Sequence, residues 1–366
     1  MRKKICHIST VHDPFDVRIF HKECVTLSES NDVHLIANHS KKEIVNNVTI
    51  WPIGNEPINR FQRIFKFVNS AFKIAIQLDA DVYHIHDPEL LRIAKKLKKK
   101  KKIVIYDAHE DLPRQILTKH WIPKILRTLI AFFVERYENK VVRKMDGIVT
   151  ATNEIKNRFT KENPNTVNVN NFPILNEFKS KADLLSNSKD PHLVYSGGIA
   201  KQRGIYELIS CLEESDIKLN LAGKYLDPSL EVELKKLKGW KKVIDHGFVS
   251  RLEIANIYQS SIAGLVTLYP TKNYKTSMPV KMFEYMAAGL PVIASNFPLW
   301  ESIINKYNCG ICVNPYSAIE IKNAINEIIE NPEKAKEMGD NGRKIAFDKY
   351  NWDNEGEKLV KLYQQF

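Results

Sequence analysis

The sequence predicts an α/β protein built from two Rossmann-like domains, each a mostly parallel sheet with helices on both faces. Three observations support this prediction. Short apolar segments alternate with helical ones over residues 4–169, the alternation stops over 173–190, and it restarts at residue 192. Strands that alternate with helices at this spacing form parallel sheets. At 366 residues the chain is also long for a single core, so two domains are expected.

The first half of the chain alternates β-branched, apolar segments with longer segments of helical periodicity. The apolar segments predict strands, because Val and Ile suit the pleated, half-buried surface of a sheet. Strands are expected at 4–9, 33–37, 48–52, 82–86, 103–106, 147–151 and 167–169, and helices at 16–28, 58–78, 90–99 and 116–145. The N-terminal domain is therefore expected to span residues 1–172.

The segment 173–190 is rich in Asn, Ser, Lys and Asp and is bounded by Pro173 and Pro191, so we expect a linker there. Strands then follow at 192–195, 218–222, 242–245, 263–268, 291–295 and 310–313. Helices are expected between these strands and at 318–330, 332–350 and 352–363. A second domain is expected over residues 191–350.

Composition restricts the classes of protein that fit. Hydrophobic residues make up 43% and charged residues 27%, and no apolar run approaches the roughly 20 residues of a membrane span. No secretory signal is apparent, and five scattered cysteines suit a reducing cytoplasm. Cys309 and Cys312 have CxxC spacing without a second pair, which favours a buried strand over a metal or redox site. The formal charge of +12 predicts an anionic partner: a nucleotide, nucleic acid or an anionic membrane.

Residues 276–295, TSMPVKMFEYMAAGLPVIAS, are the most informative segment of the second domain. A loop is expected to lead into a short helix that stops at Gly289, a residue type suited to the left-handed position past a helix end. Glu284 is a carboxylate among apolar residues, so its charge must be paired or must face a polar ligand. The alternative is a glutamate on the wet face of an amphipathic helix.

The loop 196–204, SGGIAKQRG, links a strand to a helix and has features of a phosphate-binding loop. Gly197 and Gly198 allow close approach of an anion, and the next helix directs its N-terminal N–H groups to the same place. Lys201 and Arg203 add positive charge. The loop fits neither the Walker pattern nor GxGxxG, which disfavours an ATP or nicotinamide role. A second helix N-terminus near residues 278–281 suits the rest of a diphosphate.

Six motifs occur in order: VHDPFDVRIFHKE (11–23), DVYHIHDPELL (81–91), VIYDAHEDLP (104–113), YSGGIAKQRGI (195–205), HGFVS (246–250) and SMPVKMFEYMAAGLPVIAS (277–295). In these motifs the chain resembles the retaining GT-B glycosyltransferases of family 4, most of all bacterial enzymes of capsule, O-antigen lipopolysaccharide or other exopolysaccharide biosynthesis. The resemblance runs nearly end to end. It implies two Rossmann-like domains that face each other across a cleft, and a C-terminal helix (351–366) that returns to the N-terminal domain.

The resemblance also implies that the chain moves a sugar from a nucleotide-diphosphate donor to a saccharide acceptor. Glu284 falls on the glutamate that binds the donor ribose, Arg203 on the basic residue at the diphosphate, and His109 on the histidine beside the transferred sugar. These three are the candidate catalytic residues. The full candidate donor site is Gly197, Gly198, Lys201, Arg203, Phe248, Val249, Asn273, Thr276, Ser277, Met278, Pro279, Val280, Lys281 and Glu284.

Two positions depart from the family pattern. The family has a glutamate where this chain has Thr276, and an arginine where it has Gly198. Asn273 or Thr276 would then offer neutral hydrogen bonds to the sugar. Lys201 or Lys281 would support Arg203 at the diphosphate.

On the acceptor side the candidates are His12, Asp16, Arg18, His86 and Asp87. Each has a structural alternative: Asp16 suits a helix cap, His86 and Asp87 suit turn chemistry, and His109 suits a strand end. The family mechanism retains the anomeric configuration, and fixed charges and helix ends would stabilise the leaving diphosphate. We therefore expect no cofactor and no metal. Asp79-Ala-Asp81 has DxD spacing, but it precedes a strand, where carboxylates flank or cap the element.

Basic segments with apolar residues lie at 58–68, 95–102 and 119–127, the last including Trp121, Ile122 and Ile125. They predict docking on the inner leaflet of the cytoplasmic membrane, where a lipid-linked saccharide acceptor would lie. Nucleic acid is not expected, because no RNP, helix-turn-helix or zinc-finger pattern is present. Two alternatives stay open: a GT-B nucleotide-sugar 2-epimerase, and a catalytically inactive scaffold of a polysaccharide assembly.

Overall fold

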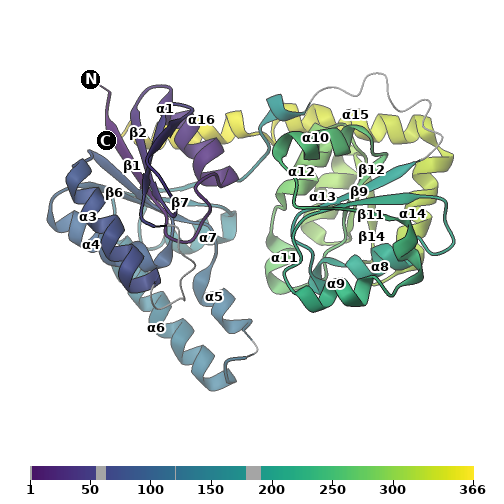
Figure 1. Ribbon diagram of the computed structural model, residues 1–366, viewed down its shortest axis with the longest axis horizontal. Coiled ribbons are helices and arrows are strands. Elements are labelled where there is room, and N and C mark those ends of the chain that lie inside the picture. The colour runs from purple at the N-terminus through teal and green to yellow at the C-terminus, as the bar shows by residue number, and fades with distance from the viewer. Residues whose placement is uncertain (1, 55–62, 120, 179–190) are drawn as a thin grey trace. The chain divides into compact units, whose positions relative to one another are not determined.

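The computed structural model describes residues 2–54, 63–119, 121–178 and 191–366. The chain forms two compact units. The N-terminal unit comprises residues 1–171 and 353–366, and the C-terminal unit comprises residues 172–352 (Figure 1). Each unit is a sheet flanked by helices, as the sequence predicts.

The sheet of the N-terminal unit has the order β3-β4-β2-β1-β5-β6-β7-β8, and only the β3–β4 pair is antiparallel. Its strands are β1 (Lys4–Ile8), β2 (Asp32–Ala37), β3 (Glu43–Val45), β4 (Val48–Pro52), β5 (Val82–Ile85), β6 (Ile103–Ala108), β7 (Gly147–Thr150) and β8 (Thr166–Asn168). Strand β3 was not predicted. It is joined to β4 by Asn46 and Asn47, both at positive φ, which is the geometry of a tight hairpin turn.

The helices of this unit are η1 (Val17–Cys24), α1 (Val25–Ser28), η2 (Arg63–Phe67), α3 (Val68–Leu78), η3 (Pro88–Leu90), α4 (Leu91–Lys99), α5 (Leu112–Leu117), α6 (Lys124–Val142), α7 (Asn153–Phe159) and α16 (Trp352–Tyr363). The prediction of one helix over 116–145 is wrong. Pro123 precedes the first residue of α6, and a proline disfavours helical geometry in the residue before it, so the chain forms two helices. Residues 58–62 of another expected helix lie outside the described residues.

The two faces of the central strands differ in character. On one face Cys6, Ile8, Tyr83, Ile85 and Tyr106 join the main apolar core of the unit. The opposite face carries the alternate residues of these strands, and near the carboxyl end of the sheet these residues are polar. His7 and His84 are register partners on adjacent strands. His86, Asp107 and His109 lie further toward the carboxyl ends of their strands. Residues of η1 and α16 contact these polar side chains, so the polar face is buried within the unit.

The sheet of the C-terminal unit is parallel throughout, with the order β11-β10-β9-β12-β13-β14. Its strands are β9 (His192–Ser196), β10 (Lys218–Ala222), β11 (Val243–Gly247), β12 (Ala263–Val266), β13 (Val292–Ser295) and β14 (Gly310–Val313). Apolar clusters cover both faces. The helices are η4 (Leu175–Glu177), η5 (Lys201–Arg203), α8 (Ile205–Ser210), α9 (Pro228–Leu234), η6 (Lys238–Lys242), α10 (Arg251–Gln259), α11 (Lys272–Thr276), α12 (Val280–Ala287), α13 (Pro298–Tyr307), α14 (Ala318–Glu330) and α15 (Pro332–Asp348).

Part of the expected linker is packed rather than free. Phe172 and Phe178 are buried, and their rings contact Phe283 and Tyr258 of the C-terminal unit. Residues 179–190 of that linker lie outside the described residues. At the other end of the chain, α16 lies in the N-terminal unit, where Leu362 packs against Gly147.

Helix α12 ends as the sequence predicts. Gly289 has φ +75°, and the next residue, Leu290, donates its N–H to the carbonyl of Tyr285 at 2.9 Å. These features form a Schellman motif, which satisfies the last carbonyls of the helix. Cys309 and Cys312 flank or lie in β14, and their thiols are free. Among the described residues, the helices are all too short or too polar to cross a bilayer.

Candidate active site

The loop that follows β9 is shaped by close approach between main chains. Gly197 has φ +108°, and a Cβ at Gly223 would lie 1.8 Å from the Gly197 carbonyl oxygen. A Cβ at Gly204 would lie 2.0 Å from the Thr267 carbonyl oxygen. Only glycine fits at Gly204 and Gly223 without a shift of the backbone. The loop 196–204 is therefore held tightly against the ends of neighbouring strands.

Two cations meet at this loop. A Cβ built on Gly197 would lie 3.4 Å from Lys281 Nζ and 3.5 Å from Arg203 Nη1. Lys281 comes from the first turn of α12 and Arg203 from η5, so residues almost eighty positions apart share one place. Lys281 Nζ lies 3.6 Å above the ring of Tyr195 and, among the described residues, has no hydrogen-bond partner. Arg203 Nε likewise has none.

This arrangement is electrostatically unfavourable without a counterion. Burial lowers the pKa of Lys281 well below its usual range, the charge of Arg203 lowers it further, and Glu284 opposes the shift. The positive end of α12 adds to the field, because its cap Pro279 has no side-chain hydrogen bond to the helix. A buried lysine and a partly buried arginine beside a helix N-terminus have the chemistry that would suit an anion such as a diphosphate.

Glu284 lies on α12 with only 6% of its surface exposed, so the wet-face alternative is wrong. Arg251 Nη1 donates to Glu284 Oε1 at 2.8 Å, and the Tyr258 hydroxyl donates to Oε2 at 3.1 Å. Arg251 also binds Glu177. Sequence reasoning missed these partners. Arg251 directly follows the HGFVS motif, and that position was the available signal.

A tyrosine network joins Glu284 to the phosphate loop. Ser196 Oγ is 2.7 Å from the hydroxyl of Tyr258, which also binds Glu284. The Ser196 N–H donates to the hydroxyl of Tyr285 at 2.9 Å. All four side chains are buried. The carboxylate expected at a ribose and the loop expected at a diphosphate therefore form one rigid, hydrogen-bonded structure.

The other donor candidates lie around this centre with fewer contacts. Thr276 ends α11, is exposed, and donates its hydroxyl weakly to the carbonyl of Asn273 at 3.5 Å. The Ser277 carbonyl accepts from Trp300 Nε1 at 2.8 Å, which fixes the chain before Met278, Pro279 and Val280. Of the two lysines considered beside Arg203, Lys281 lies near it at Gly197, whereas Lys201 is exposed.

Gly198, Phe248 and Val249 complete the set of candidate donor residues. A Cβ at Gly198 would sit 3.4 Å from the Leu226 side chain, so a larger residue there would press on Leu226. Phe248 is 74% exposed, with Lys224 Nζ 4.2 Å above its ring, and Val249 packs partly against the core.

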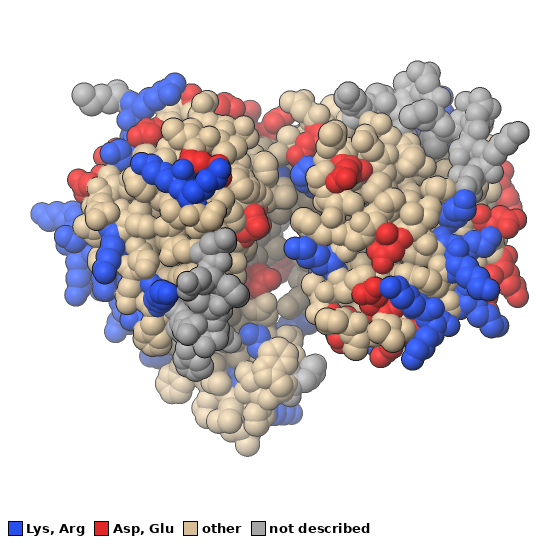
Figure 2. All heavy atoms as spheres, in the orientation of Figure 1, with Lys and Arg blue, Asp and Glu red and all other residues tan. Residues whose placement is uncertain are grey.

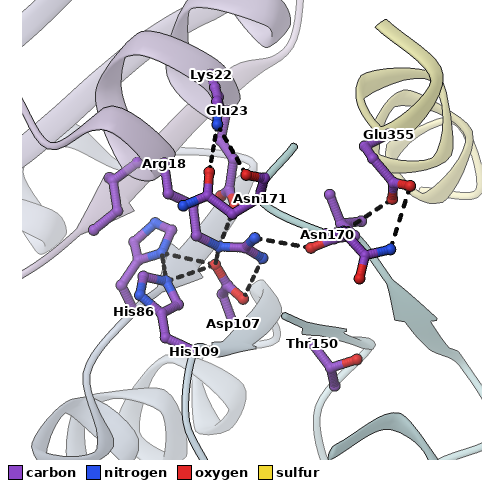
Figure 3. Close-up of polar contacts among 12 residues, drawn as sticks. Arg18, Lys22, Glu23, His86, Asp107, His109, Thr150, Asn170, Asn171 and Glu355 are labelled. Atoms are coloured by element: carbon purple, nitrogen blue, oxygen red, sulfur yellow. Dashed lines mark hydrogen bonds and ion pairs between the residues drawn. The ribbon is translucent and has the colours of Figure 1, made fainter. Parts of the chain in front are cut away.

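In the N-terminal unit, Asp107 is the centre of a buried polar cluster (Figure 3). Arg18 Nε and Nη2 each donate to Asp107 at 3.0 Å, and Arg18 Nη1 donates to the Val169 carbonyl at 2.8 Å. Asp107 Oδ2 lies 2.7 Å from His109 Nε2 and 3.3 Å from His86 Nδ1. Arg18 is thus paired with Asp107 in the interior of the unit, whereas His109 is partly exposed.

The pKa directions in this cluster follow from burial and pairing. Burial would raise the pKa of Asp107, but Arg18 and His109 hold it well below its usual range. Burial lowers the pKa of His86 to about 4, so its imidazole is neutral near pH 7. The Asp107 carboxylate accepts from Nε2 of the partly exposed His109 and so fixes the orientation of that ring. In the neutral imidazole this leaves Nδ1 as a hydrogen-bond acceptor for a ligand hydroxyl.

His12 and Asp87 fix the loop after β1. Asp87 Oδ2 accepts hydrogen bonds from the backbone N–H groups of Thr10 at 2.5 Å and Val11 at 3.2 Å, and Oδ1 is 3.1 Å from His12 Nδ1. Burial opposes ionisation of Asp87, but the bond from His12 and the Thr10 N–H lower its pKa to about 2. Asp16 accepts from the N–H groups of residues 18 and 19, so it caps η1, as its structural alternative predicted.

The DxD carboxylates are used locally. Asp79 lies 2.9 Å from Lys102 Nζ, and Asp81 accepts from the Lys4 N–H at 2.8 Å. Both carboxylates therefore lie just before the start of β5 and contact nearby protein groups, as expected.

The two-unit fold is that of the GT-B glycosyltransferases. Comparison with protein families supports this. The Glycosyltransferase Family 4 model matches residues 17–169, and the Glycosyl transferases group 1 model matches residues 176–345. The two matches leave only the ends and a short connection uncovered, and the chain belongs to the GT-B glycosyltransferases of the family 4 type.

Known proteins similar to this chain agree with that class. The alpha-D-kanosaminyltransferase of Streptomyces kanamyceticus is 25% identical over 184 residues, 48% of this chain and 46% of that protein. The chain thus spans about half the length of the first curated relatives it matches.

Two solved structures share the fold over the whole chain. The sucrose-phosphate synthase from Thermosynechococcus elongatus has a TM-score of 0.77 at 18% identity, with 100% of this chain and 99% of that one covered. The Anabaena protein HepE, solved in complex with UDP-glucose, has a TM-score of 0.74 at 13% identity, with both chains fully covered. At these identities the likeness establishes the fold.

Proposed function

We propose that this protein is a retaining glycosyltransferase that moves a sugar from a nucleotide-diphosphate donor to a lipid-linked saccharide acceptor in surface polysaccharide biosynthesis. The observation that carries the proposal is the close pair formed by the buried Lys281 and the partly buried Arg203 at Gly197, beside the N-terminus of α12. Such a cation pair without a protein counterion is explained by an anionic ligand. HepE, of the same fold, was solved with UDP-glucose and with UDP, which supports a nucleotide sugar as that ligand.

In this proposal the leaving diphosphate receives its stabilisation from fixed groups. Lys281 and Arg203 supply charge, α12 supplies aligned N–H groups, and none of them needs to reorganise during the reaction. Glu284 binds the ribose hydroxyls, and the bonds from Arg251 and Tyr258 fix its orientation. His109, whose Nε2 is held by Asp107, accepts a hydrogen bond at Nδ1 from a hydroxyl of the transferred sugar. We propose that transfer proceeds without a metal ion at the donor.

The test combines a binding panel with a product assay. Thermal shift with UDP, GDP, ADP and CMP derivatives identifies the base, and mass spectrometry then detects sugar transfer to a lipid-linked acceptor. An isomerised sugar without acceptor would favour the 2-epimerase alternative. Failure to bind any nucleoside diphosphate in calorimetry would favour the inactive scaffold. A product with inverted anomeric configuration by NMR would contradict retention.

The location at the membrane rests on the α5–α6 hairpin, which projects beyond the sheet of the N-terminal unit (Figure 1). The surface of this hairpin is apolar to an unusual degree for an exposed element. Figure 2 shows its outer end as mostly uncharged, with Lys and Arg beside it. The exposed apolar residues are Leu117, Trp121, Ile125, Leu126, Leu129, Ile130, Phe132, Phe133 and Tyr137.

We propose that this hairpin docks on an anionic bilayer. Trp121 and Ile125 are 78% and 76% exposed, and the basic residues Lys119, Lys124 and Arg127 lie among the apolar ones. Aromatic and aliphatic side chains that insert below a ring of positive charge are the pattern of interfacial helices. A lipid-linked acceptor would lie at the same surface.

Flotation with anionic vesicles at low and high salt tests the docking. Wild-type protein should float with anionic vesicles at low salt, and less at high salt. The double variant Ile125→Glu/Phe133→Glu should stay at the bottom of the gradient. The control Ile319→Glu, at a residue 73% exposed on α14, should float like wild type. Wild-type protein that shows no salt-sensitive binding to the anionic vesicles would contradict the proposal. Dimerisation through this face in analytical ultracentrifugation would also contradict it.

A further inference from the structure

A second cluster of unusual side chains lies in the interior of the N-terminal unit. The cluster consists of His7 in β1, Glu23 in η1, His84 in β5, and His86 just after β5. All four side chains are buried, and those of His7, Glu23 and His84 are fully enclosed. Each offers a potential metal-binding atom within 4.8 Å of the others. The proposed donor chemistry uses none of His7, Glu23 and His84.

The three imidazole rings are close together. The rings of His7 and His84 have centroids 4.7 Å apart and are tilted, and the ring of His86 is stacked at 4.7 Å from His84 and 5.2 Å from His7. This grouping follows from register, because His7 and His84 are partners on adjacent parallel strands and His86 is two residues further on. A core position normally holds an apolar residue here, so three histidines need a physical explanation.

The hydrogen bonds leave one nitrogen bare on each of two rings. His7 Nδ1 is 2.9 Å from His86 Nε2, and His84 Nδ1 is 2.8 Å from the Tyr363 hydroxyl. His7 Nε2 and His84 Nε2 are buried and, among the described residues, have no hydrogen-bond partner. In metal sites, a ligating histidine binds the ion with one ring nitrogen while a polar group holds the other. His7 and His84 each have one nitrogen held by a polar group and one without a hydrogen-bond partner among the described residues.

Glu23 completes the set. Both of its carboxylate oxygens are buried without a hydrogen bond among the described residues. Oε1 is 3.1 Å from Arg18 Nε, but that N–H points to Asp107, which holds Arg18 on two oxygens. Oε2 is 3.9 Å from His84 Nδ1. The carboxylate is therefore close to the histidines, and it shares the single positive charge of Arg18 with Asp107.

We propose that His7, His84 and Glu23 bind a divalent transition metal ion inside the N-terminal unit, with His86 and Tyr363 as orienting partners. Two imidazoles and one carboxylate, with a water molecule as the fourth donor, form a set that suits zinc. Zinc bound at about 2.0–2.1 Å holds its donors roughly 3.4 Å apart in a tetrahedron. The cluster would therefore contract slightly around the ion.

The ion would have a structural role. It would join β1, η1 and β5 at the carboxyl end of the sheet, next to the Asp107 cluster that orients His109. The site is enclosed on all sides by protein, so no substrate would reach it. The inference is independent of the proposed donor site, which lies in the C-terminal unit, and of the expectation that transfer needs no metal.

Metal content of protein made without a histidine tag tests the site. The purified protein is stripped with chelator, reloaded with zinc chloride, desalted, and analysed by mass spectrometry for metals. Wild type should retain about one zinc per chain, and the double variant His7→Asn/His84→Asn should retain at least about tenfold less. The control His34→Asn removes a buried histidine of β2 whose nitrogens already contact Asp32 and Trp51, and it should retain zinc like wild type.

Three measurements remain informative if the double variant does not fold. Tyr363→Phe removes only the hydroxyl that orients His84, and it should lower zinc affinity about ten- to one-hundredfold. Wild type reloaded with cobalt chloride should show visible absorption bands of four-coordinate cobalt, and its melting temperature should rise with added zinc. Wild type that retains no zinc after reloading, and whose melting temperature zinc does not change, would overturn the proposal.

Discussion

Replacing Lys281 by methionine separates a binding role from a structural one. The stem of Lys281 is buried and its Nζ, 3.6 Å from the Tyr195 ring, has no hydrogen-bond partner among the described residues. Methionine keeps most of the apolar stem and removes the charge. If Lys281 binds the donor diphosphate, the substitution removes a charged hydrogen bond worth about 1.5–3 kcal/mol. The Kd for a nucleoside diphosphate should then rise about ten- to one-hundredfold.

The Lys281→Met substitution should change the free energy of unfolding less than it changes nucleotide affinity. The lost cation–π contact with Tyr195 would lower the free energy of unfolding by about 0.5–2 kcal/mol. Removal of a buried charge repelled by Arg203 acts in the opposite direction, as the lowered pKa of Lys281 indicates. We therefore expect the free energy of unfolding to stay within about 1 kcal/mol of the wild-type value.

Isothermal titration calorimetry with the best-binding member of the nucleotide panel measures the affinity, and urea denaturation measures stability. Lys344→Met, at an exposed lysine of α15, is the matched control and should change neither quantity. A Lys281→Met protein that is folded and binds the nucleotide as tightly as wild type would refute the proposed anion site.

Three further predictions follow from the same contacts. Donor affinity should fall as the pH rises through the lowered pKa of Lys281, because only the ammonium attracts a diphosphate, and calorimetry of Lys281→Met should show a weaker pH dependence. Arg203→Ala and Glu284→Ala should each weaken donor binding by on the order of 1–3 kcal/mol, and unchanged affinity in both would argue against the site. Glu284→Ala should also lower the melting temperature, because Arg251 loses a buried partner. Asp87→Asn should lower the free energy of unfolding by about 2 kcal/mol near neutral pH, because the folded pKa of Asp87 is about 2 against an ordinary 3.8. Urea denaturation at several pH values should show that this difference disappears as the pH falls from 3.8 to about 2.

The alternation of apolar and helical segments was sufficient to predict both sheets. Parallel strands are buried on both faces, so they appear as continuous apolar runs, and these runs can be read without tertiary information. The misses are local. The break at Pro123 had a signal in the proline itself, and the β3–β4 hairpin had one in Asn46 and Asn47, whose residue type tolerates positive φ. The short strand β3 has too few residues for its periodicity to be recognised.

The candidate site was predicted in part. Arg203, Lys281 and Glu284 were identified, and so was the need for a partner to the buried carboxylate. The identity of that partner was not, because Arg251 and Tyr258 lie 33 and 26 positions from Glu284, and no local pattern specifies a contact at such a distance. For the same reason Arg18 appeared to be an acceptor-side residue, whereas the fold places it against Asp107, 89 positions away.

The sequence by itself therefore determined the secondary elements, the two-unit α/β architecture, the glycine positions and the types of charged group near the strand ends. These properties depend on periodicity, backbone conformation and residue chemistry, all of which are local. Only the tertiary structure decided which charged side chains pair with each other. It paired Arg18 with Asp107, placed Lys281 beside Arg203 at Gly197, and brought His7 next to His84. The physical reason is that the free energy of a buried charge or imidazole depends on neighbours brought to it by the register of strands far apart in the chain.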